Sequence, residues 1–145
     1  MYKRQILTVG DPRLDETIVT DLSLSSDEQV LFISKLFMKS DLPAILADNY
    51  LPLRLISEPY APEDLGLAIY DFLERFSRQR LTYYLSEIIP LAAQTDMADT
   101  LQIQAGTPLI SFDETGYNGE NEPILKAFSF FRDDLLRFRL LRRRV

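Results

Sequence analysis

The sequence predicts an α+β fold in which helices cover one face of an antiparallel sheet. Strand-like segments occur in pairs joined by turn-forming residues, as in β-hairpins. The helical segments do not alternate one per strand, as they would in a parallel sheet. The chain has 145 residues, of which 46% are hydrophobic, and this size suits one domain with one core.

The N-terminal segment predicts a short strand followed by a short helix. Residues 5–9 are β-forming and apolar, and Gly10-Asp11-Pro12 would end the strand. Residues 14–22 are predicted to be helical, and a polar connector follows them.

The next part of the chain predicts the first hairpin. Residues 29–38 are rich in β-forming and apolar side chains, and residues 44–51 supply the answering strand, which Pro52 closes. The turn-forming residues 39–43 lie between them, which predicts a loop of about five residues.

The clearest helix begins at Asp64. Its apolar residues recur with helical spacing and are expected in the core: Leu65, Ile69, Phe72, Leu73 and Phe76. Residues 79–89 then alternate as a strand, and residues 96–101 form a short helix for which Thr95 is the expected N-cap.

The C-terminal part predicts a second hairpin and a final strand. Residues 109–117 and 124–131 are the paired strands, joined by a loop over residues 118–123. Residues 135–141 are predicted to be a last strand, because Leu136, Phe138 and Leu140 alternate with arginines.

The composition favours a binding module over an enzyme. The chain has no histidine and no cysteine, which removes the commonest general base, thiol nucleophiles and most transition-metal sites. We therefore expect no catalytic residue, no metal and no cofactor. No apolar run approaches the roughly 18–20 residues that span a bilayer, and no signal peptide is recognisable, so we expect a cytoplasmic protein that does not bind membranes.

The charge distribution is uneven. The net charge is −6, and an acidic surface repels nucleic-acid phosphates. The one basic cluster is terminal and consists of Arg137, Arg139 and Arg142 to Arg144. It could contact DNA or anionic lipid, but a solvated end, or pairing with acidic residues of a neighbour, is the favoured interpretation.

Several segments, in order and at matching spacings, resemble the UTRA domain of GntR-type bacterial transcription regulators of the HutC subfamily. The similar segments are Val30 to Pro43 with Tyr50-Leu51-Pro52, Glu87-Ile88-Ile89 with Ala98 to Ile110, and Tyr117-Asn118-Gly119 with Pro123 and Phe130 to Asp134.

The resemblance implies a chorismate-lyase-like fold, with a six-stranded antiparallel sheet, flanking helices and a central ligand pocket. It also implies a homodimeric regulator that binds a metabolite effector such as a sugar phosphate, an amino-acid derivative, a phosphonate or a fatty acid. Residues 1–145 would form a single UTRA-type domain. The winged helix-turn-helix domain that precedes it in the family is absent from this chain, and DNA would be contacted only through that domain. A piece cut from a longer regulator is favoured over a stand-alone sensor.

The resemblance also implies ligand-binding positions on the first hairpin. Family members carry two arginines where this chain has Lys35 and Phe37, which share one strand face. Lys35 keeps one cation, so a carboxylate or more apolar effector is favoured over a doubly clamped phosphate; it could instead be a surface lysine. Asn49 is the candidate hydrogen-bonding group on the partner strand, where an acidic residue of the family is replaced by Ala47.

The remaining candidate ligand residues lie on the later strands. Glu87 takes the position of a ligand-contacting glutamate, and Tyr83 shares its face; a salt bridge is the alternative for Glu87. Glu114 could bind ligand or form an ion pair with Lys35 or Lys126. Lys126 and Phe128 could form the far wall of the pocket or belong to the core, whereas Arg132, with Asp133 and Asp134, is expected to fix the last turn.

The main hypothesis is therefore an effector-sensing and dimerisation domain. Two alternatives are a stand-alone chorismate-lyase-like enzyme and a dimerisation module whose pocket has collapsed. The enzyme requires converging catalytic groups, and none is recognisable in the sequence. The collapsed pocket is favoured by the missing arginine and acid.

Overall fold

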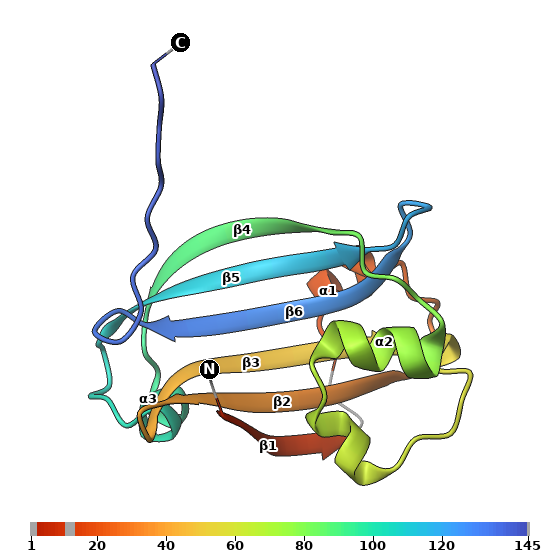
Figure 1. The fold of residues 1–145 in the computed structure, drawn as a ribbon, viewed down its shortest axis with the longest axis horizontal. Helices are drawn as coiled ribbons and strands as arrows, with labels where there is room; N and C mark the ends of the chain where they lie inside the picture. Colours follow the sequence, from red (N-terminus) through yellow and green to blue (C-terminus); the bar gives the residue numbers. More distant parts are fainter. Residues whose placement is uncertain (1–2, 11–13, 145) are drawn as a thin grey trace.

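The computed structural model describes residues 3–10 and 14–144 (Figure 1). The strands are β1 (Lys3–Gly10), β2 (Val30–Lys39), β3 (Leu42–Pro52), β4 (Tyr83–Ala92), β5 (Pro108–Tyr117) and β6 (Pro123–Arg132). The helices are α1 (Glu16–Asp21), α2 (Ile69–Ser77) and α3 (Thr95–Leu101), with short 3-10 helices η1 (Leu53–Leu55) and η2 (Pro62–Gly66). No helix in these two ranges is long and apolar enough to cross a membrane.

The six strands form one sheet in the order β1-β2-β3-β6-β5-β4, and every neighbouring pair is antiparallel. This confirms the expected six-stranded antiparallel sheet. Both predicted hairpins, β2–β3 and β5–β6, are present. They meet through β3 and β6, where Ala47 pairs with Ser129 across a large sequence separation.

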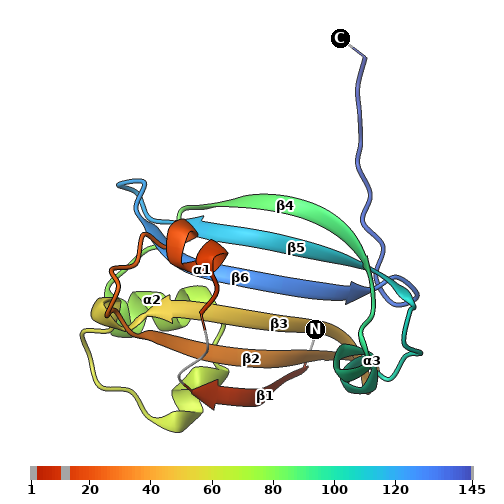
Figure 2. The ribbon, with the colours of Figure 1, turned by 180° about the vertical axis from the view of Figure 1, so that it is seen from behind.

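Helices flank both faces of the sheet, not one as the sequence pattern predicted. We call the face that carries α2 the front face (Figure 1) and the face that carries α1 and α3 the back face (Figure 2). The cross-strand row Lys35, Ala47, Ser129, Phe112 and Ile88 belongs to the front face. Side chains two residues along each strand share that face, and those one residue along point to the back face.

Each face has its own apolar core. On the front face, Phe72 and Leu73 of α2 pack with Ile33, Leu51 and other buried residues of the sheet. On the back face, Ala98 and Leu101 of α3 pack with Leu36, Leu46 and Leu109. Because the two cores bury opposite sides of the same strands, helices are needed on both faces.

The predicted helix from Asp64 is divided into η2 and α2. The Asp64 carboxylate accepts a hydrogen bond from the Ala61 amide at 2.8 Å, which caps η2. Gly66 then ends η2, since glycine is a poor helix former, and α2 begins at Ile69. The predicted core residues Leu65, Phe72 and Leu73 are buried.

Two local predictions at turns and caps are wrong. The first hairpin has a two-residue turn, Ser40-Asp41, with φ values of 51° and 62°, not a five-residue loop. Leu42 and Pro43 join β3 because a register shift between Phe37 and Met38 accommodates the proline. Thr95 is the first residue of α3, and Gln94 is its N-cap.

The ends of the predicted elements also differ in two places. Leu135 lies in a turn, and residues 136–141 have no regular secondary structure and pair with no strand among the described residues, so the predicted last strand is wrong. Strand β1 begins two residues earlier than predicted and includes Gly10, which was expected to stop it, while Asp11 and Pro12 of the predicted stop signal lie outside the described residues.

Candidate functional site

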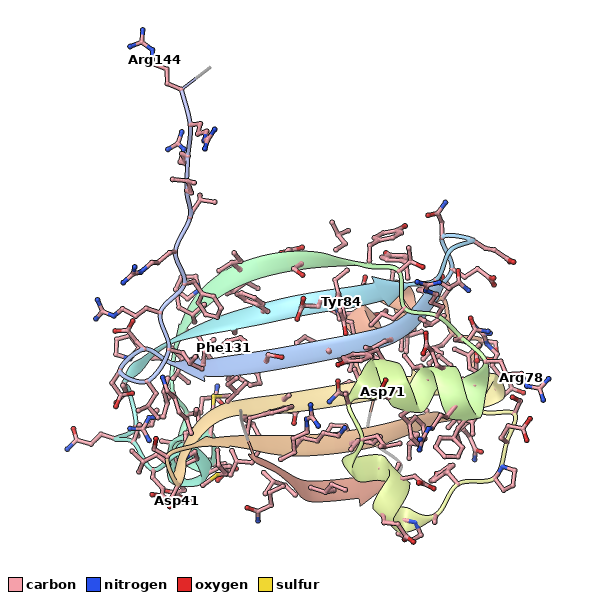
Figure 3. All side chains as sticks on the ribbon, viewed as in Figure 1. Asp41, Asp71, Arg78, Tyr84, Phe131 and Arg144 are labelled. Carbon is pink, nitrogen blue, oxygen red and sulfur yellow. The ribbon has the colours of Figure 1, made fainter. Side chains whose placement is uncertain are left out.

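A cavity of about 370 Å³ lies on the front face, between the first turn of α2 and the central strands. The two hairpins supply opposite sides of its lining, and β4 contributes Tyr84. In Figure 3, Tyr84 and Phe131 lie on the same side of the sheet as α2. Four of the predicted ligand residues line this cavity: Lys35, Phe37, Asn49 and Glu114.

Lys35 is the most informative group of the cavity. Its side chain is 2% exposed, and its Nζ donates a hydrogen bond to the Leu67 carbonyl at 2.6 Å. No ion pair joins it to another residue of the described segments. Burial, and then the charge of Arg4, lower the pKa of Lys35 to about 8. A buried ammonium without a carboxylate partner is costly, so an anionic ligand group would stabilise it.

The other polar groups provide orientation. The Asn49 amide donates to the Ile33 carbonyl at 3.3 Å. The Glu114 carboxylate accepts a 2.5 Å hydrogen bond from the Ser86 hydroxyl. Since one of its oxygens is bound in this way, Glu114 keeps acceptor capacity for a hydroxyl or amine of a ligand.

Tyr84 reaches the cavity because it pairs with Gly116 on β5. A Cβ at Gly116 would lie 3.3 Å from the Tyr84 ring and 2.6 Å from Leu81 Cδ1, so glycine gives the ring its space. Burial and the charge of Glu114 raise the pKa of Tyr84, which keeps the phenol protonated and able to donate.

The first turn of α2 adds to the positive character of the cavity. Ala68, the N-cap, and the next two residues line the cavity. Ala68 has no side-chain acceptor for the free amides of this turn, and such amides favour an anion. Arg4 lies over the Phe37 ring, with its guanidinium carbon 5.8 Å from the ring centroid, and supplies a second cation at the rim.

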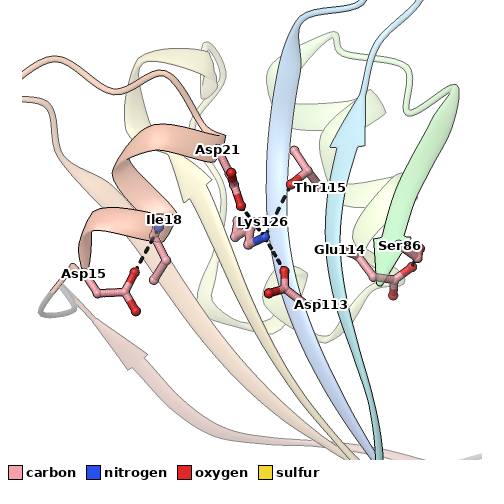
Figure 4. Close-up of polar contacts among 8 residues, drawn as sticks. All are labelled: Asp15, Ile18, Asp21, Ser86, Asp113, Glu114, Thr115 and Lys126. Carbon is pink, nitrogen blue, oxygen red and sulfur yellow. Dashed lines mark hydrogen bonds and ion pairs between the residues drawn. The ribbon is translucent and has the colours of Figure 1, made fainter. Parts of the chain in front are cut away.

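The remaining four candidates lie on the back face. Lys126 binds Asp113, Asp21 at 2.6 Å and Thr115 at 3.4 Å (Figure 4). Phe128 packs beside Tyr50 with a centroid distance of 6.0 Å. The Lys126–Asp21 ion pair ties α1 to the sheet.

Glu87 and Tyr83 lie on β4, also on the back-face side. Glu87 is exposed and has no hydrogen-bond or ion-pair partner among the described residues, so the salt bridge given as the alternative to its ligand role is not formed there. Tyr83 stacks on Tyr117 with 5.0 Å between ring centroids and donates to Asn121 at 2.8 Å. The expectation that Lys35 and Glu87 flank one cavity is wrong, because they occupy opposite faces, and Glu114 supplies the cavity carboxylate.

Sequence reasoning missed Arg4 and Tyr84 as cavity residues. The alternation along residues 83–89 was recognised, but alternation alone does not show which of the two sets of side chains faces α2 and the cavity. The glycine opposite Tyr84 was a usable signal, because a strand glycine often marks a close approach by a neighbour.

A second hollow, of about 520 Å³, lies beside the α3–β5 loop. Its main charged group, Arg132, is already bound to Asp134 at 2.7 and 3.0 Å and to the carbonyls of Leu101 and Pro43 at 3.0 and 3.3 Å. This agrees with a role for Arg132 in fixing the turn after β6. No group of three or more acidic side chains among the described residues has a metal-binding arrangement.

One family model and one curated relative match most of this chain. The family model described as the UTRA domain matches residues 2–137. The HTH-type transcriptional repressor NagR of Bacillus subtilis (strain 168) is 25% identical over 123 residues, which make up 85% of this chain and 50% of NagR. The chain therefore spans about half the length of this curated relative.

Solved structures share the fold. A ligand-binding domain ascribed to a GntR-family transcriptional regulator of Bordetella bronchiseptica superposes with a TM-score of 0.89 at 20% identity, covering 99% of this chain and 91% of that one. A GntR-family transcriptional regulator of Enterococcus faecalis V583 gives a TM-score of 0.85 at 16% identity, with 96% and 99% covered. At these identities the likeness establishes the fold.

Proposed function

This chain belongs to the UTRA domain family, and from that premise we propose that it is the effector-sensing domain of a GntR-type transcription regulator. A metabolite would bind in the front-face cavity and change how an attached winged helix-turn-helix domain binds DNA. The observation that carries this proposal is the buried Lys35 ammonium, which has a carbonyl partner but no carboxylate partner in the described ranges.

The cavity chemistry favours an effector with one anionic group and an apolar body. One buried lysine, with Arg4 at the rim, suits a carboxylate better than a doubly charged phosphate, because lysine binds as a point charge and not as a bidentate fork. Phe37 and Phe131 supply apolar walls. Glu114 would accept a hydrogen bond from a hydroxyl or amine at the other end of the effector.

Lys35, Phe37, Asn49 and Glu114 are the proposed ligand residues. The ligand roles predicted for Tyr83, Glu87, Lys126 and Phe128 stay predictions. These four side chains lie on the face opposite the cavity, so they are not part of the proposed set. Arg4 and Tyr84 join the proposed set because they line the same cavity.

Gating requires an effector that binds two arrangements of the regulator with different affinity. The Lys35–Leu67 hydrogen bond links the cavity to the segment between η2 and α2. An effector whose anionic group replaces the Leu67 carbonyl as the partner of the Lys35 ammonium would break this hydrogen bond and favour a displaced α2. We propose this segment as the element whose position the effector shifts.

We infer that the site binds its ligand and does not transform it. The relatives are transcription-regulator domains, and the cavity pairs its ammonium with a backbone carbonyl and its carboxylate with a serine hydroxyl. Conversion of a bound metabolite to product by the purified chain would contradict this inference.

The test is a thermal-shift screen with small carboxylates, sugar acids, amino-acid derivatives and phosphorylated sugars, followed by calorimetric titration of the hits. An effector present at 100 times its Kd should stabilise the domain by about 2.7 kcal/mol. Lys35→Gln should weaken binding of an anionic hit by roughly 10- to 100-fold, because a charge-assisted hydrogen bond is lost.

Lys39→Gln is the matched control. Lys39 lies on the same strand but is exposed and binds the Leu135 carbonyl at 2.9 Å, so its loss should leave effector affinity unchanged. A screen without any hit would favour the collapsed-pocket alternative. If the Lys35→Gln variant and the wild-type chain bind the effector with equal affinity, the proposal that the effector binds at Lys35 is wrong.

A further inference from the structure

A smaller hollow, which we call the side hollow, lies next to the front-face cavity. Its volume is about 320 Å³, and most of its lining side chains are apolar, among them Ile110, Phe112 and Phe138. On β5, Ile110 pairs with Phe131 of β6, and Phe112 pairs with Ser129. Phe131 and Ser129 both line the front-face cavity, so the two spaces are direct neighbours on one face of the sheet.

Three phenylalanine rings, which we call the aromatic partition, separate the two spaces. Between ring centroids, Phe138 lies 4.9 Å from Phe112 and 4.8 Å from Phe131, and Phe112 lies 5.0 Å from Phe131. Phe131 lines the front-face cavity, whereas Phe112 and Phe138 line the side hollow. The cluster is therefore a wall that both spaces share.

Phe138 is the member of the partition that lies outside the sheet. Phe112 and Phe131 belong to paired strands. Phe138 follows β6 on the segment that runs past β5 and β4 (Figure 1), has no regular secondary structure and is 52% exposed. The turn before it is fixed, because the Leu136 amide donates to the Arg132 carbonyl at 3.0 Å. Beyond this turn, a half-exposed side chain can rotate away without breaking any strand pair.

The apolar side of the front-face cavity leads from Lys35 to the partition. Lys35 pairs with Ala47 of β3, which pairs with Ser129 of β6, and Phe131 lies two residues further along β6. Strands about 4.8 Å apart and a rise of about 3.3 Å per residue put the Cα atoms of Lys35 and Phe131 roughly 12 Å apart. Ala47 and Ile45 line the space between them. An apolar tail that starts at the Lys35 ammonium and follows these side chains meets the partition.

We propose that the side hollow is a subsite for the apolar tail of the effector, and that Phe138 is the specificity-determining residue that limits access to it. With the ring in place, the partition sets the length of tail that the cavity holds. With the ring turned away, a longer tail enters the side hollow, whose apolar side chains remove it from water. This inference deepens the proposed function and rests on it, because the tail is carried by the anionic group bound at Lys35.

The experiment is calorimetric titration of the full chain and its variants with straight-chain carboxylates from butanoate to decanoate. Each methylene that becomes buried should tighten binding by roughly three- to fourfold. In the wild-type chain this gain should stop at the tail length that meets the partition. Phe138→Ala removes the ring, so the gain should continue over at least two further methylenes and reach about tenfold.

Leu140→Ala is the matched control. Leu140 lies two residues further along the same segment and is 83% exposed, so its truncation should leave the wild-type dependence on tail length unchanged. Phe138 is half-exposed and outside the sheet, so Phe138→Ala should still fold, as near-UV circular dichroism would confirm.

Phe138→Trp supplies a readout that does not depend on affinity. The chain has no tryptophan, so the introduced indole is the only one and reports on the partition alone. Saturating decanoate should shift its emission maximum, because the tail reaches the ring. Saturating butanoate, whose tail is too short to reach the partition, should not.

The outcomes separate the inference from the proposed function. If the wild-type chain and Phe138→Ala both bind and show the same dependence on tail length, or if decanoate leaves the Phe138→Trp emission unchanged, the inference is wrong and the proposed function stands. Binding by Phe138→Ala alone would support the partition and contradict effector sensing by the wild-type chain. If neither chain binds any of these carboxylates, both the subsite and the proposed carboxylate effector are wrong.

Discussion

Two lysines in the sheet are equally buried, but their pKa values shift in opposite directions. Lys35 and Lys126 are each 2% exposed. Burial and Arg4 lower the pKa of Lys35. For Lys126, burial also acts to lower the pKa, but the hydrogen bonds and charges of Asp113 and Asp21 outweigh it and raise the pKa. A buried lysine with a lowered pKa is a typical functional-site group, whereas Lys126 has its counter-ions in place.

The lowered pKa of Lys35 makes effector binding depend on pH. Below about pH 8 the ammonium is charged and attracts an anion, and above it the neutral amine does not. We expect the affinity for an anionic effector to fall as the pH rises through 8, and Lys35→Gln to flatten this profile. Calorimetric titrations from pH 6.5 to 9.5, about 1.5 units on either side of that value, would measure it. A wild-type profile that stays flat would show that Lys35 does not contact the anion.

The Lys126 ion pairs should stabilise the fold. Lys126→Met leaves the Asp21 and Asp113 carboxylates without their cation and should lower the free energy of unfolding by about 1–3 kcal/mol at pH 7. Because the folded-state pKa of Lys126 is raised above 10.5, its contribution is complete below pH 10.5 and is lost as the pH rises through the folded pKa. Urea unfolding across this range should therefore show the two proteins converging at high pH, while the exposed-site control Lys39→Met stays within about 0.5 kcal/mol of wild type.

At the scale of elements, periodicity predicted what packs along a strand or helix. The strands β2, β3, β5 and β6, predicted from runs of β-forming and apolar residues, and the helical stripe that includes Phe72 and Leu73 were predicted correctly, because these patterns record burial. The two-residue turn and the break at Leu67 were missed, since they depend on backbone torsions and on a single cap from Asp64. Residues 135–141 have the alternating pattern of a strand, but they pair with neither edge strand of the described sheet.

The Ser40-Asp41 turn can be improved. Positive φ at both positions is the signature of a type I′ turn, which prefers asparagine at the first position. Ser40→Asn should stabilise the domain by roughly 0.5 kcal/mol, because asparagine tolerates the left-handed region better than serine. Thermal unfolding would measure the change, and Ser40→Val, a β-branched residue at the same position, should be destabilising. Equal stability of the two variants would contradict the assigned turn.

At the scale of the molecule, the candidate site was only half predictable. Lys35, Phe37 and Asn49 were grouped correctly because they follow one hairpin whose alternation fixes a shared face. Glu87 was grouped with them wrongly, since the sheet position of β4 depends on the pairing of β3 with β6, and on that of β5 with its two neighbours. Nothing local in the sequence encodes the pairing of β3 with β6.

The cavity lies across the join between β3 and β6, where the N-terminal and C-terminal halves of the chain meet. Its lining includes three residues of β3 from one half and three of β6 from the other: Ile45, Ala47 and Asn49, and Ala127, Ser129 and Phe131. Parting these two strands would abolish the binding site, even if each hairpin stayed closed. Bound effector should therefore slow amide hydrogen exchange most strongly along this join, so that the ligand fastens together two halves of one chain.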